Sequence, residues 1–355
     1  MATCGAAARE LHLERLLRVA TCLAEGGYGA QVAQLSASAR AFYSDAQVWA
    51  AQVHHRGGTY GRTHLMFAAH MGSAARVLYL LDRGAAADAV DVSGVSALML
   101  ASYSGHFEIV RCLVERGSAN VNAARTTDGM TALLFASQSG HLETVRFLVE
   151  RGGANVNAAR IDDGFTALMG ASQNGYLEIA RCLVEREGVN VNAARITDGV
   201  TALMFASKNQ HLEIVRCLVE RGGADVNAAR TPDGATALIG ASAMGQLETV
   251  RYFVEHGGAH VNAAQTTDGM TALMWASRNG HLEIARCLVE RGGANVKAAR
   301  TTDGSTALMV ASLRGHVDTV RLLLQHGADK QTADTAGHTA LFYASAHPLV
   351  LAVLA

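Results

Sequence analysis

Residues 128–153 read DGMTALLFASQSGHLETVRFLVERGG, and close copies of this segment return every 35 residues. The copies can be followed by the tripeptide Thr-Ala-Leu, which begins at Thr131, Thr166, Thr201, Thr236, Thr271 and Thr306. Ser96-Ala97-Leu98 extends this register upstream, and degenerate copies start at Thr63 and Thr339. A fixed period of this size is typical of a stack of small units, none of which buries its apolar face alone. We therefore expect one continuous core, with function on the surface of the stack.

Each copy predicts two short helices. Thr131 is a suitable N-cap for a helix over residues 132–139, which is apolar on most sides and must be buried between its neighbours. Gly140 ends that helix, and residues 141–151 form an amphipathic second helix that a double glycine terminates. Residues 154–160 then run as an extended arm to the next Asp-Gly turn. The unit is helix, turn, helix, hairpin.

This unit resembles the ankyrin repeat. The matching residues are the Gly-x-Thr before the first helix, the loop Gly140-His141, the run Leu-Glu-x-x-Arg-x-Leu-Val-Glu, and the arm Val121-Asn122-Ala123 with its later copies. The resemblance covers residues 60–355 as about nine units, the last incomplete. It implies an all-α repeat solenoid of helix-turn-helix units with connecting hairpin loops, and a non-enzymatic scaffold that binds a partner protein across its concave face.

Two departures concern the helix start and the hairpin. The family's Thr-Pro-Leu-His is Thr-Ala-Leu-Met here, which keeps a good helix former at the first turn. Inner repeats carry two extra residues that flank the hairpin, so we expect longer or bulged hairpins beside an intact helix stack.

Composition argues against several classes of function. The 30 Lys and Arg residues balance 31 Asp and Glu for a formal charge of −1, so nucleic acid is a disfavoured partner. No run of 18 apolar residues and no signal core exists, which predicts a cytoplasmic or nuclear protein without a membrane partner. No phosphate-binding loop or nucleophile motif is present, so we expect no enzyme and no cofactor. His141, His211, His281 and His316 lie on separate rungs, so we expect loop histidines bonded to the backbone rather than a metal site.

Two arginine ladders suggest a polyanion site as a further alternative. Arg125, Arg160, Arg195, Arg230 and Arg300 recur in the hairpin arm, with Gln265 breaking the row, and a second ladder ends the second helices. An Asp follows each hairpin position three residues later, which favours local neutralisation.

Residues 1–59 lie before the array and predict a small helical segment. One interpretation is a cap over the first repeat. The other is an F-box-like module, because Ser36, Asp45 and Trp49 have the spacing of the second half of that motif, although its opening Leu-Pro is missing. The resemblance would make the chain a substrate-recognition subunit of a ubiquitin ligase, with the ligase's adaptor subunit as a partner.

The other end is apolar and uncharged from Leu349 to Ala355. An array needs polar capping units, so this end indicates a truncated reading frame, a makeshift cap or a docking segment.

Positions that vary between near-identical repeats suggest a binding surface. The residue before each Thr or Ser cap is mostly apolar, and we expect it to be exposed on the hairpin side of the concave face: Val95, Met130, Phe165, Val200, Ala235, Met270 and Ser305. Its expected neighbours on that face are Tyr103, Gln138, Gln173, Lys208, Ala243, Arg278 and Leu313. The alternative is that the longer hairpins fold over the apolar row and bury it. A third variable site alternates large with small residues, which is typical of core packing: Phe135, Gly170, Phe205, Gly240 and Trp275.

Overall fold

The structure is a computed structural model that describes residues 56–57 and 61–355. The expected N-terminal helices, with Ser36, Asp45 and Trp49, lie outside the described residues.

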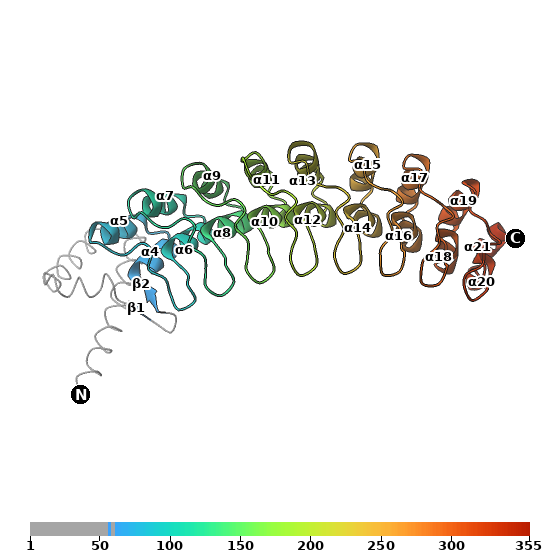
Figure 1. Cartoon of the computed structure of the whole chain (residues 1–355), viewed down its shortest axis with the longest axis horizontal. Helices are drawn as coiled ribbons and strands as arrows, with labels where there is room; N and C mark the ends of the chain where they lie inside the picture. The colour runs from blue at the N-terminus through green and yellow to red at the C-terminus, as the bar shows by residue number, and fades with distance from the viewer. Residues whose placement is uncertain (1–55, 58–60) are drawn as a thin grey trace, which may run out of the picture.

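The described chain is a row of helix pairs that form a long, gently curved solenoid (Figure 1). The first helices of the pairs are α4 (His64–His70), α6 (Ala97–Ser104), α8 (Ala132–Ser139), α10 (Ala167–Asn174), α12 (Ala202–Lys208), α14 (Ala237–Ala243), α16 (Ala272–Asn279), α18 (Ala307–Leu313) and α20 (Ala340–Tyr343). The second helices are α5 (Ala74–Asp82), α7 (Phe107–Glu115), α9 (Leu142–Glu150), α11 (Leu177–Val184), α13 (Leu212–Arg216) continued by the π-helical turn η1 (Cys217–Arg221), α15 (Leu247–Glu255), α17 (Leu282–Glu290), α19 (Val317–Gln325) and α21 (Pro348–Leu354). The predicted all-α repeat solenoid is confirmed.

Local chemistry sets the helix ends as the sequence predicts. The Thr131 hydroxyl accepts a hydrogen bond from the Leu134 amide at 3.3 Å, which satisfies one of the free donors at the start of α8. Gly140 ends that helix with φ of 85°, a left-handed conformation that glycine adopts without strain. The equivalent Thr caps α10, α12, α14, α16 and α18 in the same way.

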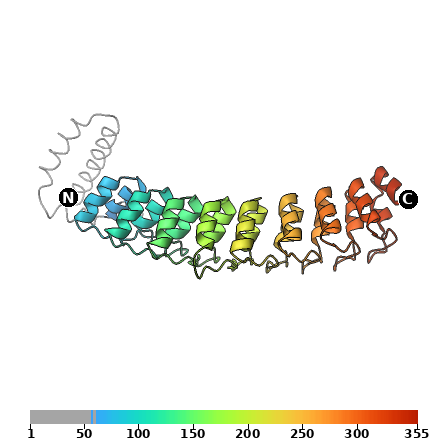
Figure 2. The same cartoon turned by 90° about the horizontal axis from the view of Figure 1, so that it is seen from above.

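The core is one continuous layer that runs the length of the stack. First helices pack against the first helices of neighbouring rungs and second helices pack against second helices, so the helices lie side by side along the stack (Figure 2). Ala132, Leu133 and Ala136 of α8 are buried, as are Val145 and Leu148 of α9. Each rung therefore depends on its two neighbours for the burial of its apolar side chains.

Hairpins link the rungs on the inner side of the curve (Figure 1). Each closes on a single antiparallel bridge, such as Ala124 with Thr131 and Ala159 with Thr166. Neighbouring hairpins are also bonded, since the Ile161 amide donates to the Asp128 carbonyl at 2.9 Å. A two-residue pairing of β1 (Arg56–Gly57) with β2 (Arg62–Thr63) precedes the first helix. The extra residues thus lengthen the hairpins and leave the helix stack intact, as expected.

The apolar C-terminal residues form α21, which packs against α19 as the second helix of the last described pair. Val350 and Leu354 are buried on that side, whereas Leu349 is 72% exposed. The Lys330 ammonium donates to the Leu354 carbonyl at 2.8 Å, which binds the helix end. This segment therefore docks on the stack itself.

Candidate functional site

The apolar row that precedes the first helices is buried. Val95, Met130, Phe165 and Met270 are each no more than 7% exposed, and Val200 is half-buried. The expectation that these five side chains lie exposed on the concave face is therefore wrong. The alternative is confirmed: the hairpins fold over the row.

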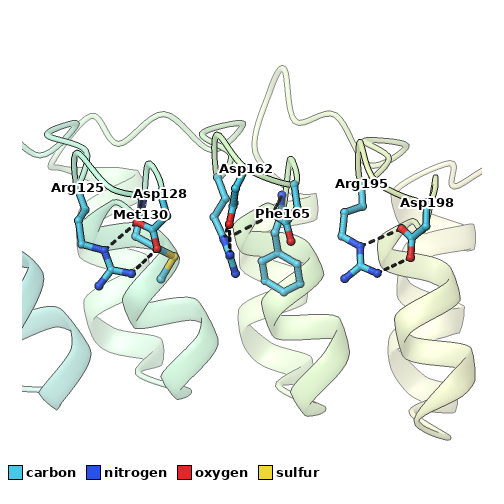
Figure 3. A network of polar contacts seen from close by, with 9 residues as sticks. Arg125, Asp128, Met130, Asp162, Phe165, Arg195 and Asp198 are labelled. Carbon is cyan, nitrogen blue, oxygen red and sulfur yellow. Dashed lines mark hydrogen bonds and ion pairs between the residues drawn. The ribbon is translucent and has the colours of Figure 1, made fainter. Parts of the chain in front are cut away.

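The hairpin turn explains this burial. The Arg125 amide donates to the Met130 carbonyl at 2.8 Å, and one Asp128 carboxylate oxygen accepts the Met130 amide at 3.1 Å. The Arg125 guanidinium binds the same carboxylate through Nε at 2.8 Å, so side chain and backbone close the turn together (Figure 3). The turn holds the residue before the helix cap against the core, where its side chain packs between rungs.

The hairpin arginine ladder is neutralised locally, as predicted. Arg125 and Arg195 bind Asp128 and Asp198, and Figure 3 shows both pairs in the same orientation on separate rungs. The hydrogen bond from each arginine lowers the pKa of its Asp partner below the ordinary value of 3.8. The other ladder members pair likewise: Arg160 with Asp162 and Asp163, Arg230 with Asp233, and Arg300 with Asp268 and Asp303. A polyanion would have to displace these carboxylates, so the ladder does not offer an open cationic track.

Hairpin arginines also cover Phe135 and Phe205, two of the large residues of the alternating site. The Arg125 guanidinium lies 5.1 Å from the centre of the Phe135 ring, within the range of a cation–π contact. Where the site is Gly170, the Phe165 ring occupies the space instead, since a Cβ on that glycine would lie 3.4 Å from it. Core packing is thus confirmed for Phe135 and Gly170. It fails at Gly240, which is exposed and has nothing within 4 Å of its Cβ position.

Gln265 breaks the arginine row for a structural reason. Its side-chain oxygen accepts the Trp275 indole N–H at 2.7 Å, and its amide donates to Asp233 at 3.1 Å. The cation over the Trp275 ring is supplied from the other side by Arg278, at 5.1 Å from the ring centre. Gln265 therefore fixes the indole and leaves Arg278 at the surface.

The second predicted row does face solvent. Tyr103 is 54% exposed, and the residues at its position in later rungs are exposed too: Gln138, Gln173, Lys208 and Arg278. We call this surface the helix-one ridge. It consists of the exposed row, the residue that follows each member of the row, and the loop that leads from there to the second helix. Tyr103 also touches the Phe135 ring edge-on, with centroids 5.9 Å apart, which anchors it to the next rung.

Loop side chains bond each rung of the ridge to the one before it. The His141 ring binds the Tyr103 carbonyl at 2.9 Å, and His281 and His316 bind the Ala243 and Arg278 carbonyls. Each ring lies against the loop glycine of the preceding rung, where a Cβ would clash with it. The prediction of loop histidines bonded to backbone is confirmed for these three. The ridge is consequently a pre-organised surface.

A shallow pocket of about 510 Å³ opens on the ridge near its C-terminal end. Its walls are Trp275, Arg278, Asn279, Arg314 and His316. Of these, only Arg278 belongs to the predicted binding residues. Arg314 was detectable in sequence, because the same position is Ser104, Ser139, Asn174 and Asn279 on other rungs. Trp275, which lines the pocket, is held by its hydrogen bond to Gln265. This bond cannot be predicted from the repeat pattern.

In the part of the chain that the structure describes, no three His, Cys, Asp or Glu side chains converge as metal ligands. None of the helices in residues 61–355 is long and apolar enough to span a bilayer.

Comparison with known proteins agrees with this architecture. The family described as ankyrin repeats (3 copies) matches residues 37–124, 65–160, 118–195, 153–230, 187–265, 203–300, 260–334 and 293–355. Among solved structures, the chain is similar to the ankyrin repeat domain of Bcl-3, a member of the IkappaB protein family, with 30% identity and a TM-score of 0.57. That similarity covers 64% of this chain and 99% of the Bcl-3 domain. A search of curated proteins finds no match. Because the family match extends over most of its length, the chain belongs to the ankyrin repeat family.

Proposed function

We propose that this protein is a non-enzymatic scaffold that binds a partner protein through the exposed row of the helix-one ridge. Its contact residues include Tyr103, Gln138, Gln173, Lys208 and Arg278. The family favours such a role, since ankyrin repeats are interaction modules. The Bcl-3 domain, similar at 30% identity, is likewise an ankyrin repeat domain, from a member of the IkappaB protein family.

One observation carries the choice of surface. The exposed row varies from rung to rung, while loop side chains bond its backbone carbonyls to the next rung, three of them through histidine rings and one through Gln246. A rigid frame under variable side chains reduces the ordering cost of binding and leaves specificity to the row. The buried row of Met130 and Phe165 supports the surface from below and makes no direct contact in this proposal.

The test is affinity purification with the full chain, followed by binding measurements on the purified partner. The triple variant Tyr103→Ala/Gln138→Ala/Gln173→Ala should weaken binding at least tenfold, since an interface concentrates its energy in a few central residues.

The control is Arg111→Ala/Arg146→Ala/Arg181→Ala, which removes three exposed or half-exposed side chains from the second helices of the same rungs. Binding that survives the ridge variant and fails in this control would place the interface on the outer face. Thermal unfolding of both variants checks that the stack is intact.

A further inference from the structure

Charge is segregated across the stack. The segments from each helix cap to the start of the second helix contain no Asp or Glu in any rung: residues 63–73, 96–106, 131–141, 166–176, 201–211, 236–246, 271–281, 306–316 and 339–347. Within residues 61–355, the carboxylates lie on the second helices and in the segments that link them to the next rung, where arginines pair with many of them. The helix-one ridge thus lacks the internal neutralisation seen elsewhere, although the whole chain is balanced.

The cations of the ridge lie in its C-terminal half. They are Lys208, Arg278 and Arg314, and none of them forms an ion pair with another described residue. Arginines on the second helices behave differently: Arg286 pairs with Glu283 and Glu290, and Arg321 pairs with Asp318. The ridge cations therefore lack carboxylate partners because the acidic residues lie on other parts of each rung. Their positive charge can attract an acidic partner that binds the ridge.

Two of these cations border the pocket at Trp275. Arg278 and Arg314 line it together with the indole, and the Arg278 guanidinium lies 5.1 Å from the centre of the indole ring, so a ligand there meets one aromatic side chain and two guanidinium groups. Arginine is suited to planar, bidentate contact with carboxylates, and an indole face is suited to an apolar side chain. Asn279 is fixed by its bond to the Ala243 carbonyl at 2.8 Å, so the wall is ordered before any ligand arrives.

One rung lies between the pocket and Lys208, and it carries no charge on the ridge. It has the half-buried Ala243 in the row, the open Gly240 beside it and the 58% exposed Met244 after it. Packed helices lie roughly 8–10 Å apart, so two rungs span about 20 Å, the length of about six residues of extended chain at ~3.3 Å each. A short extended segment can reach from Arg278 to Lys208 across this uncharged rung, where Met244 offers an apolar contact.

We propose that Lys208, Arg278 and Arg314, together with Trp275, bind an extended acidic segment of the partner protein that also carries an apolar side chain. The proposal rests on the proposed function and specifies the chemistry of the partner. The acidic side chains bind the three cations, and the apolar one lies on the indole.

The test uses the purified full chain and fluorescence anisotropy with three labelled probes: a decapeptide of eight glutamates around two central leucines, its lysine counterpart, and a single-stranded RNA decamer. The glutamate peptide should bind, with weaker binding at high salt. Arg278→Ala/Arg314→Ala should weaken it about tenfold, through the loss of two exposed charge pairs.

The matched control is Arg286→Ala/Arg321→Ala, which removes the same charge from the outer face and should leave the affinity unchanged. An equal loss in both variants, absence of peptide binding, or RNA binding as tight as that of the peptide would overturn the proposal. Binding measurements with the purified partner distinguish a failure of the acidic-segment proposal from a failure of the proposed function. If the triple ridge variant abolishes its binding while Arg278→Ala/Arg314→Ala does not, only the acidic-segment proposal fails; if neither variant matters, both fail.

Discussion

At two junctions between rungs, different residues form the hydrogen bond that links the loop of one rung to the first helix of the rung before it. Between α6 and α8, the left-handed Gly105 makes room for the ring of His141, which binds the Tyr103 carbonyl at 2.9 Å. Between α12 and α14, the glycine is replaced by Gln210, held at φ of 64°, and the ring by Gln246. The Gln246 amide still binds the equivalent carbonyl, that of Lys208, at 2.8 Å.

The central junction also differs in its second helix. There α13 gives way to the π-helical turn η1, whereas α9 and α17 are regular over nine residues. The cores beneath are alike, because Leu148 and Leu218 are both fully buried. The comparison teaches that the bond between rungs can be kept by different side chains, provided that a loop residue and its contact in the next rung change together.

The largest expected effect tests whether the two cores are equivalent. Leu148→Ala and Leu218→Ala should each lower the free energy of unfolding by about 3 kcal/mol, since each leaves a cavity at a fully buried site. Urea denaturation measures both. A clearly smaller loss for Leu218→Ala would show that the π-helical turn lets the central core collapse around the cavity.

A second comparison concerns asparagines that bond adjacent hairpins. The Asn157 side chain accepts from the Asn190 amide and donates to the Gly188 carbonyl, both at 2.7 Å. Its central counterpart, Asn192, accepts from the Asp225 amide at 2.8 Å but reaches the Gly223 carbonyl only at 3.5 Å. Asn157→Ala should therefore cost about 1.5 kcal/mol and Asn192→Ala about 1 kcal/mol. Equal losses in urea denaturation would mean that the longer contact is a full hydrogen bond.

Because Gln210 and Gln246 are in matched positions at the central junction, we expect their effects on the free energy of unfolding to be coupled. Gln210→Gly removes a side chain from a left-handed position and should stabilise the protein by about 1 kcal/mol. Gln246→His alone should destabilise it, because the ring would meet the Gln210 side chain. The double variant restores the arrangement of the other rungs, so a double-mutant cycle should give a coupling of about 1 kcal/mol. Additive effects would show that the two changes are independent.

The smallest effect concerns the hairpin ion pairs and depends on pH. Arg125→Met should cost about 0.5 kcal/mol at pH 7, whereas Arg230→Met at the central junction should cost less, since its contact with Asp233 is 3.4 Å long. Arg125 holds the pKa of Asp128 below 3.8 in the folded state. The contribution of this pair is thus present above the unfolded pKa and is lost as pH falls through the folded one.

Urea unfolding at pH 7 and at pH 2.5 measures the difference. The deficit of Arg125→Met should be smaller in acid, and a deficit that is unchanged there would assign it to lost packing over the Phe135 ring.

The helices were predictable because their determinants are local. Thr131 and Gly140 each act within one turn of helix, and the 35-residue repetition shows which faces must be buried. The exposed row from Tyr103 to Arg278 follows from the same helical geometry. The division into residues 1–59 and 60–355 stays a prediction.

The apolar row could not be placed in this way. Whether Met130 is exposed depends on how the Arg125–Asp128 pair closes a turn, which is a property of the folded hairpin. The pocket at Trp275 was missed for a related reason. Gln265 looks like a gap in an arginine row until its hydrogen bond to the indole is seen.

The matched change at Gln210 and Gln246 has a consequence for how such a gene can grow or shrink. Duplication or deletion of a unit that keeps Gly-His contacts on both sides creates only junctions that the protein already uses. A crossover that separates Gln210 from Gln246 instead sets a glutamine against an imidazole, or a glycine against a glutamine. Recombination between the near-identical units should therefore be tolerated on either side of this pair and selected against within it.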